Sequence, residues 1–400
     1  MKLRIALLLL FLACFGSCHT SNIEENFQTN LTATLKQFIP DKRVQLFEIK
    51  LEKKKNTVYL RGESTNAEAT QYLLSLLAKD YPLNQIHNEV RQLPDTAVGM
   101  YTWALVKQSV VPMRAKQGDA NEMVSQAIMG TPIRLLDRCG DWYLVQSPDG
   151  YLSYMENTVL QPLTEQEFKS WRSSKERYIF TAVNGWAYTE ADSKSQVVCD
   201  LVEGCIFQAK SYNTHFLRIL LPDGRIAYVK KQDCVSFSSW GNQKLDDINA
   251  RNVIADAKRL MGVPYLWGGI STKGIDCSGF TKLVFQSQGI LLERDASQQQ
   301  KYGKQIDVTN LSNFRPGDLL FFGKTPKATH VGIYIGNTRF IHASGMVKIS
   351  SLDPTKPDYS EKRDKTLISA CRILQSEEGL CVTTIKKCGW YVDYPQFINK

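Results

Sequence analysis

After a short N-terminal segment, the hydrophobic pattern is that of a small mixed α/β unit. Apolar residues recur every three to four positions across residues 27–38, which predicts an amphipathic helix. Residues 44–51 and 57–61 are strand-like on either side of a short polar turn. Thr65 and Glu68 then form a capping-box pattern before a second apolar helical run. With a final strand, the predicted order is α, β, β, α, β.

This order, with Val58-Tyr59-Leu60-Arg61-Gly62 before the second helix, resembles the small BON-type domain of envelope proteins. We assign residues 19–94 to this unit. The simpler interpretation is a spacer that holds the rest of the chain away from a membrane, and we prefer it.

An internal repeat follows. Residues 123–130 match residues 197–204, and the Pro-Asp-Gly turn at residues 148–150 recurs at residues 222–224, each at an offset of 74 residues. The surrounding runs are short, rich in β-forming residues and broken by these Asp-Gly turns. We therefore predict two copies of a small all-β barrel.

The first copy contains Gly-Asp-Trp-Tyr-Leu-Val followed by Pro-Asp-Gly-Tyr, residues 140–151, and resembles the bacterial SH3 domains of cell-wall enzymes. The second copy has His-Phe in place of the Asp-Trp pair, so we do not expect both copies to bind the same ligand. We place the two SH3-like domains at residues 95–163 and 177–240. Residues 164–176 are polar and helix-prone and are predicted to be a linker.

The pattern changes again after residue 240. A helical run ends at Gly262, before Pro264. Strands are predicted at residues 318–322, 330–335 and 339–343. Helices followed by a sheet indicate an α+β domain, which we assign to residues 245–375, with a C-terminal tail at residues 376–400.

The first residues have the pattern of an export signal. Lys2 and Arg4 precede an apolar core of about eleven residues, which is too short to span a bilayer as a helix. Small residues then precede Cys18, and residues 1–18 resemble a bacterial lipoprotein signal in which Cys18 carries lipid after cleavage. Cys14 is a second candidate for this site. The alternative is an ordinary cleaved signal, which leaves a soluble secreted protein.

Composition limits the classes of partner. The chain has 400 residues, 43% of them hydrophobic, which is enough for two to four domains with cores. Its net charge of +9 is spread along the sequence without a long basic stripe, so we do not expect nucleic-acid binding. We expect a monomer in the bacterial cell envelope, held by its lipid and most simply placed on the periplasmic side.

The cysteines do not form a metal-binding pattern. None outside the signal has CxxC spacing, and the chain has only five histidines, so we expect no structural metal and no cofactor. Export permits disulfides without requiring them. Cys199, Cys205 and Cys234 are predicted to be buried thiols or to contain one bridge, and Cys381 is placed to pair with Cys388.

Cys277 has the sequence context of a nucleophile. Asp276 and Ser278 favour a helix start, and apolar residues at helical spacing follow, so Cys277 is predicted in the first turn of a helix. A helix N-terminus and a nearby imidazolium lower the pKa of a thiol. The unpaired amides of that first turn also suit an oxyanion. The alternative for Cys277 is half of a disulfide or a core thiol.

His330 and His342 lie on consecutive predicted strands. A hairpin centred near residue 336 is expected to set the two histidines directly opposite each other, close enough for one ring to orient the other. This is the order of nucleophile, base and orienting group that cysteine hydrolases use. We predict that Cys277 is the nucleophile, His330 the base and His342 the residue that fixes the tautomer of His330.

Five motifs in this region resemble those of the NlpC/P60 family of papain-like cell-wall peptidases, over residues 253–374. They are Pro264-Tyr265-Leu266-Trp267-Gly268-Gly269, Asp276-Cys277-Ser278-Gly279, Arg294-Asp295-Ala296-Ser297-Gln298-Gln299, Pro316-Gly317-Asp318-Leu319 and Thr329-His330-Val331-Gly332-Ile333-Tyr334. The family pattern maps its catalytic residues onto Cys277, His330 and His342, and implies a papain-like fold.

Tandem SH3 domains before such a domain are similar to one branch of the family, the γ-D-glutamyl-L-diamino-acid endopeptidases, also called dipeptidyl-peptidase VI. This resemblance implies cleavage of murein peptides after L-Ala-γ-D-Glu when the L-Ala amine is free. It implies substrate contacts for Tyr265, Trp267, Asp276, Ser278 and Asp295, and a groove closed by Glu122 and Tyr154 of the first SH3 domain.

Physical arguments support one of these roles and offer simpler alternatives for the others. Asp295 is expected to neutralise the substrate amine, because an unpaired buried carboxylate penalises a capped peptide. Tyr265 and Trp267 alternatively pack beneath the active-site loop, and Asp276 alternatively serves as a helix N-cap. Glu122 and Tyr154 are equally well read as a solvated loop acid and a barrel-core aromatic.

Two alternatives for the whole protein remain. One is an endopeptidase or amidase that acts on intact peptidoglycan, with the SH3 domains as wall-binding anchors. The other is an inactive wall-binding scaffold, which requires a missing catalytic residue, and none of the three is missing.

Overall fold

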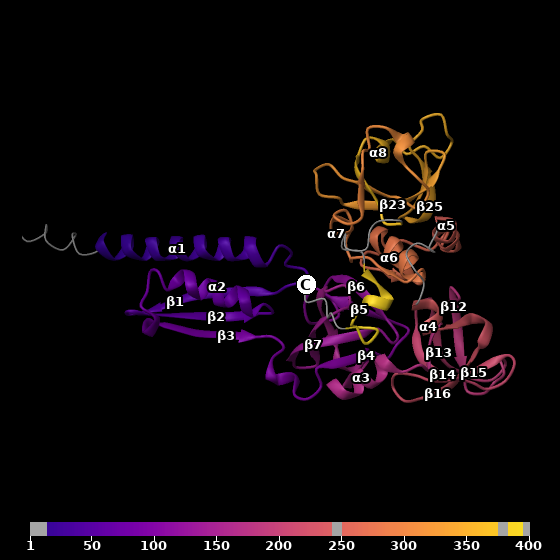
Figure 1. The fold of residues 1–400 in the computed structure, drawn as a ribbon, viewed down its shortest axis with the longest axis horizontal. Coiled ribbons are helices and arrows are strands. Elements are labelled where there is room, and N and C mark those ends of the chain that lie inside the picture. The colour runs from indigo at the N-terminus through magenta and orange to yellow at the C-terminus, as the bar shows by residue number, and fades with distance from the viewer. Residues whose placement is uncertain (1–13, 242–249, 375–382, 395–400) are drawn as a thin grey trace, which may run out of the picture. The chain divides into compact units, whose positions relative to one another are not determined.

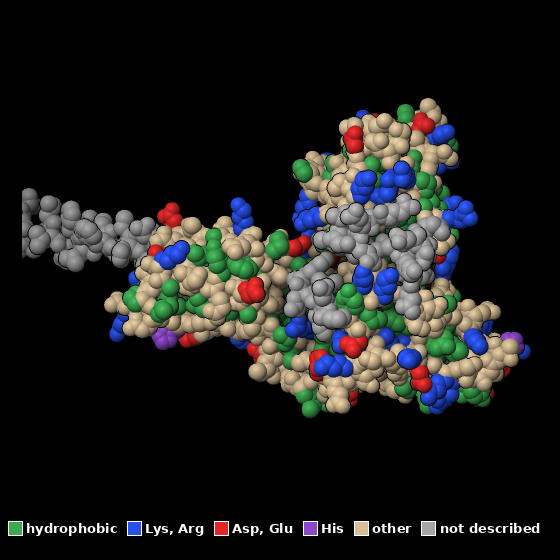
Figure 2. Space-filling model, viewed as in Figure 1, with side chains coloured by type: hydrophobic (Ala, Val, Ile, Leu, Met, Phe, Trp, Pro, Cys, Tyr) green, Lys and Arg blue, Asp and Glu red, His purple; other side chains and the backbone are tan. Residues whose placement is uncertain are grey.

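The computed structural model describes the chain except for residues 1–13, 242–249, 375–382 and 395–400. The chain divides into two compact units, Met1–Ala97 and Val98–Asn399, and each is described separately. On the visible faces, lysine and arginine side chains are interspersed with acidic and uncharged ones, without a continuous basic stripe (Figure 2).

The first unit is a three-stranded sheet with two helices on one face (Figure 1). Its elements are α1 (Cys14–Phe38), β1 (Phe47–Lys54), β2 (Thr57–Ser64), α2 (Ala67–Leu77) and β3 (Ile86–Gln92). Strands β1 and β2 are antiparallel, and β2 and β3 are parallel. The apolar faces of the helices and sheet share one core. The likeness of this unit to a BON-type domain stays a prediction.

The start of α2 differs from the predicted capping box. Asn66 is the N-cap, and its side chain accepts a hydrogen bond from the Ala69 amide at 2.9 Å. Thr65 instead accepts one from the Leu46 amide, so its hydroxyl is used to join two segments of the unit. The capping-box prediction was therefore wrong by one residue, because a tertiary contact competes for the threonine.

The predicted export signal lies largely outside the described residues. Cys18 falls in the backbone of α1, but its side chain is not described, so cleavage and lipidation stay predictions. Among the helices of the described chain, none combines the length and the apolar character that a membrane crossing requires.

The second unit begins with two seven-stranded sheets of the same design. The first is formed by β4 (Trp103–Val106), β5 (Val110–Arg114), β6 (Met123–Ile128), β7 (Pro132–Cys139), β8 (Trp142–Gln146), β9 (Leu152–Glu156) and β10 (Leu160–Leu163). The second is formed by β11 (Arg177–Phe180), β12 (Asn184–Tyr188), β13 (Val197–Val202), β14 (Ile206–Ser211), β15 (Phe216–Leu220), β16 (Ile226–Lys230) and β17 (Cys234–Ser236).

The repeat in the sequence is also a repeat in the structure. The strand orders, β10-β4-β7-β8-β9-β5-β6 and β13-β12-β16-β15-β14-β11-β17, are the same order written in opposite directions. Each strand of the second sheet begins 74 residues after its counterpart, as in β4 at Trp103 and β11 at Arg177. We call residues 98–163 the first β-domain and residues 177–236 the second β-domain.

The segment between the β-domains is part of a core. Helix α3 (Glu165–Ser173) starts with a capping box at Thr164 and buries Phe168 and Trp171. The Phe168 ring stacks on Trp103 of β4 at 3.9 Å, and Trp103 in turn meets Trp390 edge-on. This helix is therefore more than a connector, because its apolar face joins the first β-domain to the end of the chain.

Residues 383–394, which the sequence placed in the tail, also pack into the second unit. Strand β27 (Thr383–Thr384) pairs with β20 (Ile290–Leu291), and Ile385, Trp390 and Tyr391 are buried. Cys388 is buried, and its expected partner Cys381 lies outside the described residues, so this pairing stays a prediction. Cys199, Cys205 and Cys234 are free thiols, which matches the buried-thiol alternative.

The rest of the second unit is an α+β domain, residues 250–374. Its helices are α5 (Ala250–Arg259), α6 (Cys277–Ser287), α7 (Ala296–Gln299) and α8 (Glu361–Asp364), and α4 (Phe237–Gly241) precedes them. Its sheet consists of β21 (Lys304–Ile306), β26 (Leu367–Arg372), β22 (Leu319–Phe322), β23 (His330–Gly336), β24 (Arg339–Ser344) and β25 (Met346–Ser351), in that order. Short strands β18 (Ile270–Ser271) and β19 (Gly274–Ile275) pair before α6. Helix α6 lies against β23 and β24.

Candidate active site

Cys277 is the first residue of α6, as its sequence context predicted. Asp276 is the N-cap and accepts a hydrogen bond from the Gly279 amide at 2.7 Å. Gly279 has no room for a side chain, because a Cβ there would lie 2.0 Å from the carbonyl oxygen of Gly269. The loop before the helix therefore crosses directly over its first turn and fixes the position of the thiol.

A buried arginine holds the N-cap in place. Arg294, only 1% exposed, donates from both terminal nitrogens to the two Asp276 oxygens, at 2.5 and 3.2 Å. It also donates to the Ser278 hydroxyl at 3.1 Å and, through Nε, to the hydroxyl of Ser125 on β6 at 2.9 Å. A charge pair this deeply buried is kept in place only when its hydrogen bonds are satisfied. Sequence reasoning assigned no role to either Arg294 or Ser125.

His330 and His342 are in contact. Their rings meet edge-on, with Nε2 of His330 2.7 Å from Nδ1 of His342. Both side chains are buried. The expected proximity of the two imidazoles is confirmed.

The expected register of the hairpin was wrong. Residue 333 pairs with residue 341, so His342 faces Gly332 and the two histidines are diagonal neighbours on one face. The shift arises because Asn337 and Thr338 both have positive φ and form the turn, which lies further along the chain than predicted. Gly332 leaves space for the rings, since a Cβ there would lie 3.1 Å from the Cβ of His342.

Ser350 completes a chain of polar groups that the sequence did not reveal. Its hydroxyl on β25 lies 3.0 Å from Nε2 of His342. If Nε2 of His342 donates to Ser350, Nδ1 of His342 accepts from Nε2 of His330. Nδ1 of His330 is then the unprotonated nitrogen, which is the state that a general base requires.

Burial controls the protonation of this site. It raises the pKa of the Cys277 thiol to about 11, and Asp276 adds to this rise, whereas the backbone amide of Val331 and Arg294 lower the pKa. The expectation of a lowered thiol pKa is therefore not met in the substrate-free protein. Burial also lowers the pKa of His330 well below its usual value and that of His342 to about 3. The resting pair is a neutral thiol and a neutral imidazole.

Tyr265 and Arg363 share the electrostatic surroundings of Cys277. Burial, together with Cys277 and Asp276, raises the pKa of Tyr265 to about 12. Burial lowers the pKa of Arg363, while the thiol and the Tyr265 hydroxyl raise it. Arg363, on α8, was not among the predicted site residues.

Asp295 meets the first β-domain at Tyr151, a residue that sequence reasoning did not single out. The hydroxyl of Tyr151 donates to Asp295 at 3.3 Å. Tyr154 lies on β9, in register with Leu144 and Arg114. Tyr151 directly follows the Pro-Asp-Gly turn between β8 and β9, and this place in the turn was the signal that could have identified it. The role of Tyr154 in the same subsite stays a prediction.

Trp267 and Glu122 are joined as a second bridge between the same two domains. The indole Nε1 of Trp267 donates to Glu122 at 2.8 Å, and the tryptophan is 60% exposed. Packing beneath a loop is therefore not the role of Trp267. The next residue, Gly268, has φ of 79°, and a Cβ there would lie 2.3 Å from the Met123 carbonyl oxygen. The loop that carries Trp267 thus rests directly on the first β-domain.

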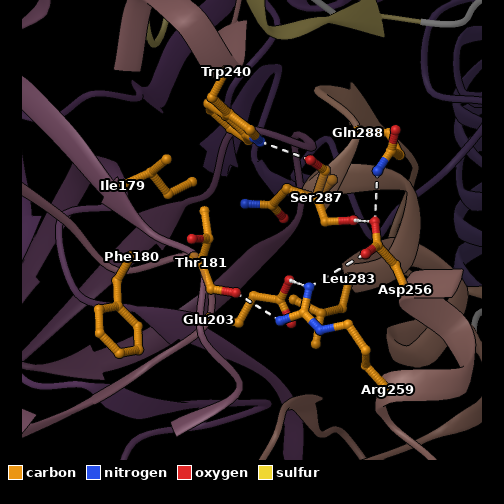
Figure 3. Close-up of a pocket in the computed structure, with 12 residues that line it drawn as sticks. Ile179, Phe180, Thr181, Glu203, Trp240, Asp256, Arg259, Leu283, Ser287 and Gln288 are labelled. Carbon is orange, nitrogen blue, oxygen red and sulfur yellow. Dashed lines mark hydrogen bonds and ion pairs between the residues drawn. The ribbon is translucent and has the colours of Figure 1, made fainter. Parts of the chain in front are cut away.

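A separate hollow of about 130 Å³ lies at the other end of α6, against the second β-domain (Figure 3). Arg259 bridges it, with contacts to Glu203 at 3.5 Å, Asp256 at 3.2 Å and the Thr181 carbonyl at 2.6 Å. Burial raises the pKa of Glu203 to about 7. Eleven residues separate the ends of α6, or about 15 Å along the helix, so this hollow is distinct from the site at Cys277.

Two family models match parts of this chain. Residues 262–366 match the NlpC/P60 family, and residues 113–160 match the bacterial dipeptidyl-peptidase Sh3 domain. The chain therefore carries an NlpC/P60 domain and a bacterial SH3 domain, as its motifs predicted. The matches include Cys277, His330 and His342 in the first case and Glu122 and Tyr151 in the second.

Several curated proteins are similar. The chain is 27% identical to the gamma-D-glutamyl-L-lysine dipeptidyl-peptidase of Bacillus cereus, over 65% of this chain and 79% of that protein. It is 27% identical to dipeptidyl-peptidase 6 of Lysinibacillus sphaericus, over 62% of this chain and 90% of that protein. It is 45% identical to the murein DD-endopeptidase MepS/murein LD-carboxypeptidase of Escherichia coli K12, over 26% of this chain and 55% of that protein.

A solved structure has the same fold over most of the second unit. The crystal structure of an NlpC/P60 family protein from Bacillus cereus ATCC 10987 aligns with a TM-score of 0.57 and 24% identity. The alignment covers 68% of this chain and 99% of that one. The mixed α/β architecture with an NlpC/P60 fold and an SH3-like domain is thereby supported.

Proposed function

We propose that this protein, a cysteine peptidase with an NlpC/P60 domain and a bacterial SH3 domain, hydrolyses the bond between γ-D-Glu and the diamino acid of murein peptides whose N-terminal L-Ala is free. The observation that carries this proposal is the contact of Asp295 with Tyr151 of the first β-domain. A carboxylate and a phenol at this junction suit the binding of an ammonium group. The names of the two dipeptidyl-peptidase relatives agree with this specificity.

Cys277, His330 and His342 carry the proposed chemistry. The Cys277 sulfur attacks the γ-carbonyl carbon of D-Glu while Nδ1 of His330 takes the thiol proton. His330 then gives this proton to the leaving amine of the diamino acid, and a thioester remains on Cys277. Water, activated by His330, hydrolyses the thioester. Because Cys277 and His330 are neutral at rest, charge separates between them only as the proton moves and the sulfur attacks. The desolvated site strengthens the attraction between the positive imidazolium of His330 and the negative charge that develops on the reacting atoms.

His342, Asp276 and Arg294 hold these groups. The 2.7 Å contact fixes the orientation of His330, and the cap of α6 fixes Cys277. The amides of the first turn of α6 lack partners within the helix, and they are the proposed donors to the oxyanion.

Recognition of the free amine is assigned to Asp295 with Tyr151, which contacts it, and to Glu122 of the same β-domain as Tyr151. An acetylated L-Ala has no positive charge to offer to the Asp295 carboxylate, so this favourable interaction is lost. Rejection of a substrate that lacks the paired group is stronger than any discrimination by apolar contacts. The Trp267–Glu122 bridge limits the groove at the same end, which favours short peptides.

A second candidate is cleavage of intact peptidoglycan. It is favoured by the 45% identity of the catalytic region to the murein DD-endopeptidase of Escherichia coli. That similarity covers 26% of this chain, whereas the two dipeptidyl-peptidase relatives are similar over 65% and 62% of it. We therefore prefer the dipeptidyl-peptidase activity.

The test compares L-Ala-γ-D-Glu-diaminopimelate with its N-acetylated form, with products identified by mass. We expect release of L-Ala-γ-D-Glu from the free peptide and loss of about 100-fold or more in kcat/KM on the acetylated one. The Asp295→Asn variant is expected to lose most of this preference, and Cys277→Ala is the inactive control. Equal cleavage of both peptides, or cleavage of intact sacculi alone, contradicts the proposal.

We also propose an extracytoplasmic location, with the lipid on Cys18 as the membrane anchor. The murein substrate and the signal-like N-terminus support it. Labelling of the expressed protein with a radioactive or clickable palmitate tests the anchor, and the Cys18→Ser variant is expected to remain unlabelled. Equal labelling of that variant contradicts the assignment of Cys18.

A further inference from the structure

Arg363 faces the catalytic residues from α8. Its guanidinium carbon lies 5.6 Å from the centre of the Phe322 ring, and that ring is 5.8 Å from the ring of His330. The charge of Arg363 also affects the pKa values of Tyr265, His330 and His342. Arg363 and His330 therefore contact the same ring, and the side chain of Arg363 is partly buried.

The acids near Arg363 are engaged with other partners. Glu361 pairs with Lys365 at 2.6 Å, Asp364 accepts from the Tyr359 hydroxyl at 2.9 Å, and Asp358 pairs with Arg339 at 2.8 Å. Within the described part of the chain, the Arg363 guanidinium forms no ion pair and no hydrogen bond of its own. The contact with the Phe322 ring offsets part of the desolvation cost of this partly buried cation, and no anion of the described chain offsets the rest.

Positive charges around Arg363 favour the binding of an anion next to it. Lys348 and Lys362 also lie close enough to lower the pKa of His330. Asp276, the acid beside Cys277, is neutralised by Arg294. The charged groups of β25 and α8 with the largest effects on His330, namely Lys348, Lys362 and Arg363, are thus basic.

We propose that Arg363 binds a free carboxylate of the substrate next to the scissile bond. The inference rests on the proposed function, because a γ-linked glutamyl peptide keeps such a carboxylate on each side of that bond. One is the α-carboxylate of D-Glu, and the other is a carboxylate of the diamino acid. A planar guanidinium matches either group with two parallel hydrogen bonds. An ordinary α-linked peptide lacks the first of these, so Arg363 would also help to select γ-glutamyl substrates.

The test measures kcat/KM for three peptides with free L-Ala: the parent L-Ala-γ-D-Glu-L-Lys, the form with amidated D-Glu, and the form with amidated Lys. In the wild-type enzyme, amidation of the bound carboxylate is expected to reduce kcat/KM by about 10- to 100-fold. In Arg363→Met, kcat/KM for the parent peptide is expected to fall by a similar factor. Amidation of the bound carboxylate is then expected to cause little further loss. Arg363→Lys is expected to recover part of the loss.

Lys362→Met is the matched control for the general effect of charge, because it removes from the same helix an exposed charge that also acts on His330 but lies outside the proposed carboxylate contact. Its ratio of parent to amidated peptide is expected to equal that of the wild type. Ratios between peptides within one variant do not depend on the amount of folded enzyme, so partial unfolding of Arg363→Met does not obscure the result.

Three results distinguish the proposals. If Arg363→Met lowers kcat/KM for the parent peptide but not for one of the amidated peptides, the result supports carboxylate binding. The amidated peptide that is unaffected then identifies the carboxylate. An equal loss on all three peptides in Arg363→Met, or no loss, overturns it while the proposed function stands. Failure of the wild-type enzyme to cleave the parent peptide contradicts the proposed function, and the assignment of Arg363 falls with it.

Discussion

The hydroxyl of Ser125 accepts a 2.9 Å hydrogen bond from Nε of Arg294, and this bond joins the first β-domain to the cap of the catalytic helix. Arg294 holds Asp276, and Asp276 caps α6 at Cys277. The first β-domain is therefore in contact with the residues that position the nucleophile, in addition to those that border the groove. Such a domain cannot move freely as a wall-binding module without disturbing the thiol.

Replacement of Ser125 by alanine tests this connection. It leaves a buried Nε donor without its acceptor, which costs about 1–3 kcal/mol. We expect a lower midpoint in urea unfolding and a fall of about 3- to 10-fold in kcat, because the position of α6 is less well fixed. Ser193→Ala, at an exposed position of the second β-domain, is the control. A stable variant with unchanged kcat would show that the contact is not used in catalysis.

The dependence of kcat/KM on pH follows from the neutral resting pair. Burial places the pKa of His330 well below 6.5 and that of the thiol at about 11. Activity requires one proton on the pair, so we expect a broad plateau, an acid limb below pH 6.5 and an alkaline limb near the thiol pKa of about 11. A single limb centred at or above pH 6.5 contradicts this assignment. The pH profile of Cys277 alkylation gives an independent measurement.

Ser350 is expected to act as a positioning residue through His342. In Ser350→Ala the Nε2 donor of His342 loses its 3.0 Å partner, and the tautomer of His342 is no longer fixed. We expect kcat to fall about 10-fold with little change in KM, and the acid limb of the pH profile to move. Ser350→Thr keeps the hydroxyl and should recover most of the rate. An equal loss in both variants indicates a packing role instead.

Glu203 should make stability depend on pH through the hollow shown in Figure 3. Its pKa in the folded protein is raised to about 7 by burial, so it contributes stability fully below its unfolded pKa of about 4.3, and this contribution is lost as pH rises through 7.

Replacement by glutamine removes this titration. Relative to the wild type, we expect Glu203→Gln to be more stable at pH 8 than at pH 5, as measured by urea unfolding at both values. The exposed Glu190→Gln is the control, for which no such difference is expected. A difference of the opposite sign shows that the ion pair with Arg259 outweighs the burial of the carboxylate.

Much of the site was identified by local signals. A capping aspartate followed by helical periodicity placed Cys277 in the first turn of α6, and alternation placed His330 and His342 on neighbouring strands. The 74-residue repeat anticipated two sheets with the same strand order. These features depend on residues close together in sequence, or on a pattern repeated along it, so they can be predicted from the sequence alone.

The register of the catalytic hairpin depended on a turn. Positive φ at Asn337 and Thr338 moved its centre, although neither residue is a glycine. A change in the position of the turn alters which residues face each other without changing the hydrophobic pattern. The imidazoles remained on the same face, which is why their contact was correctly expected while their pairing was not.

By itself, the sequence determined which thiol and which imidazoles are the candidate catalytic groups, because helix starts and strand alternation are properties of short segments. Only the tertiary structure decided that Tyr151 meets Asp295, that Ser350 supports His342 and that Arg363 faces the site without an acidic partner in the described chain. These residues come from separate elements, and no local pattern marks them. Their roles arise from burial and from which charges the fold brings together.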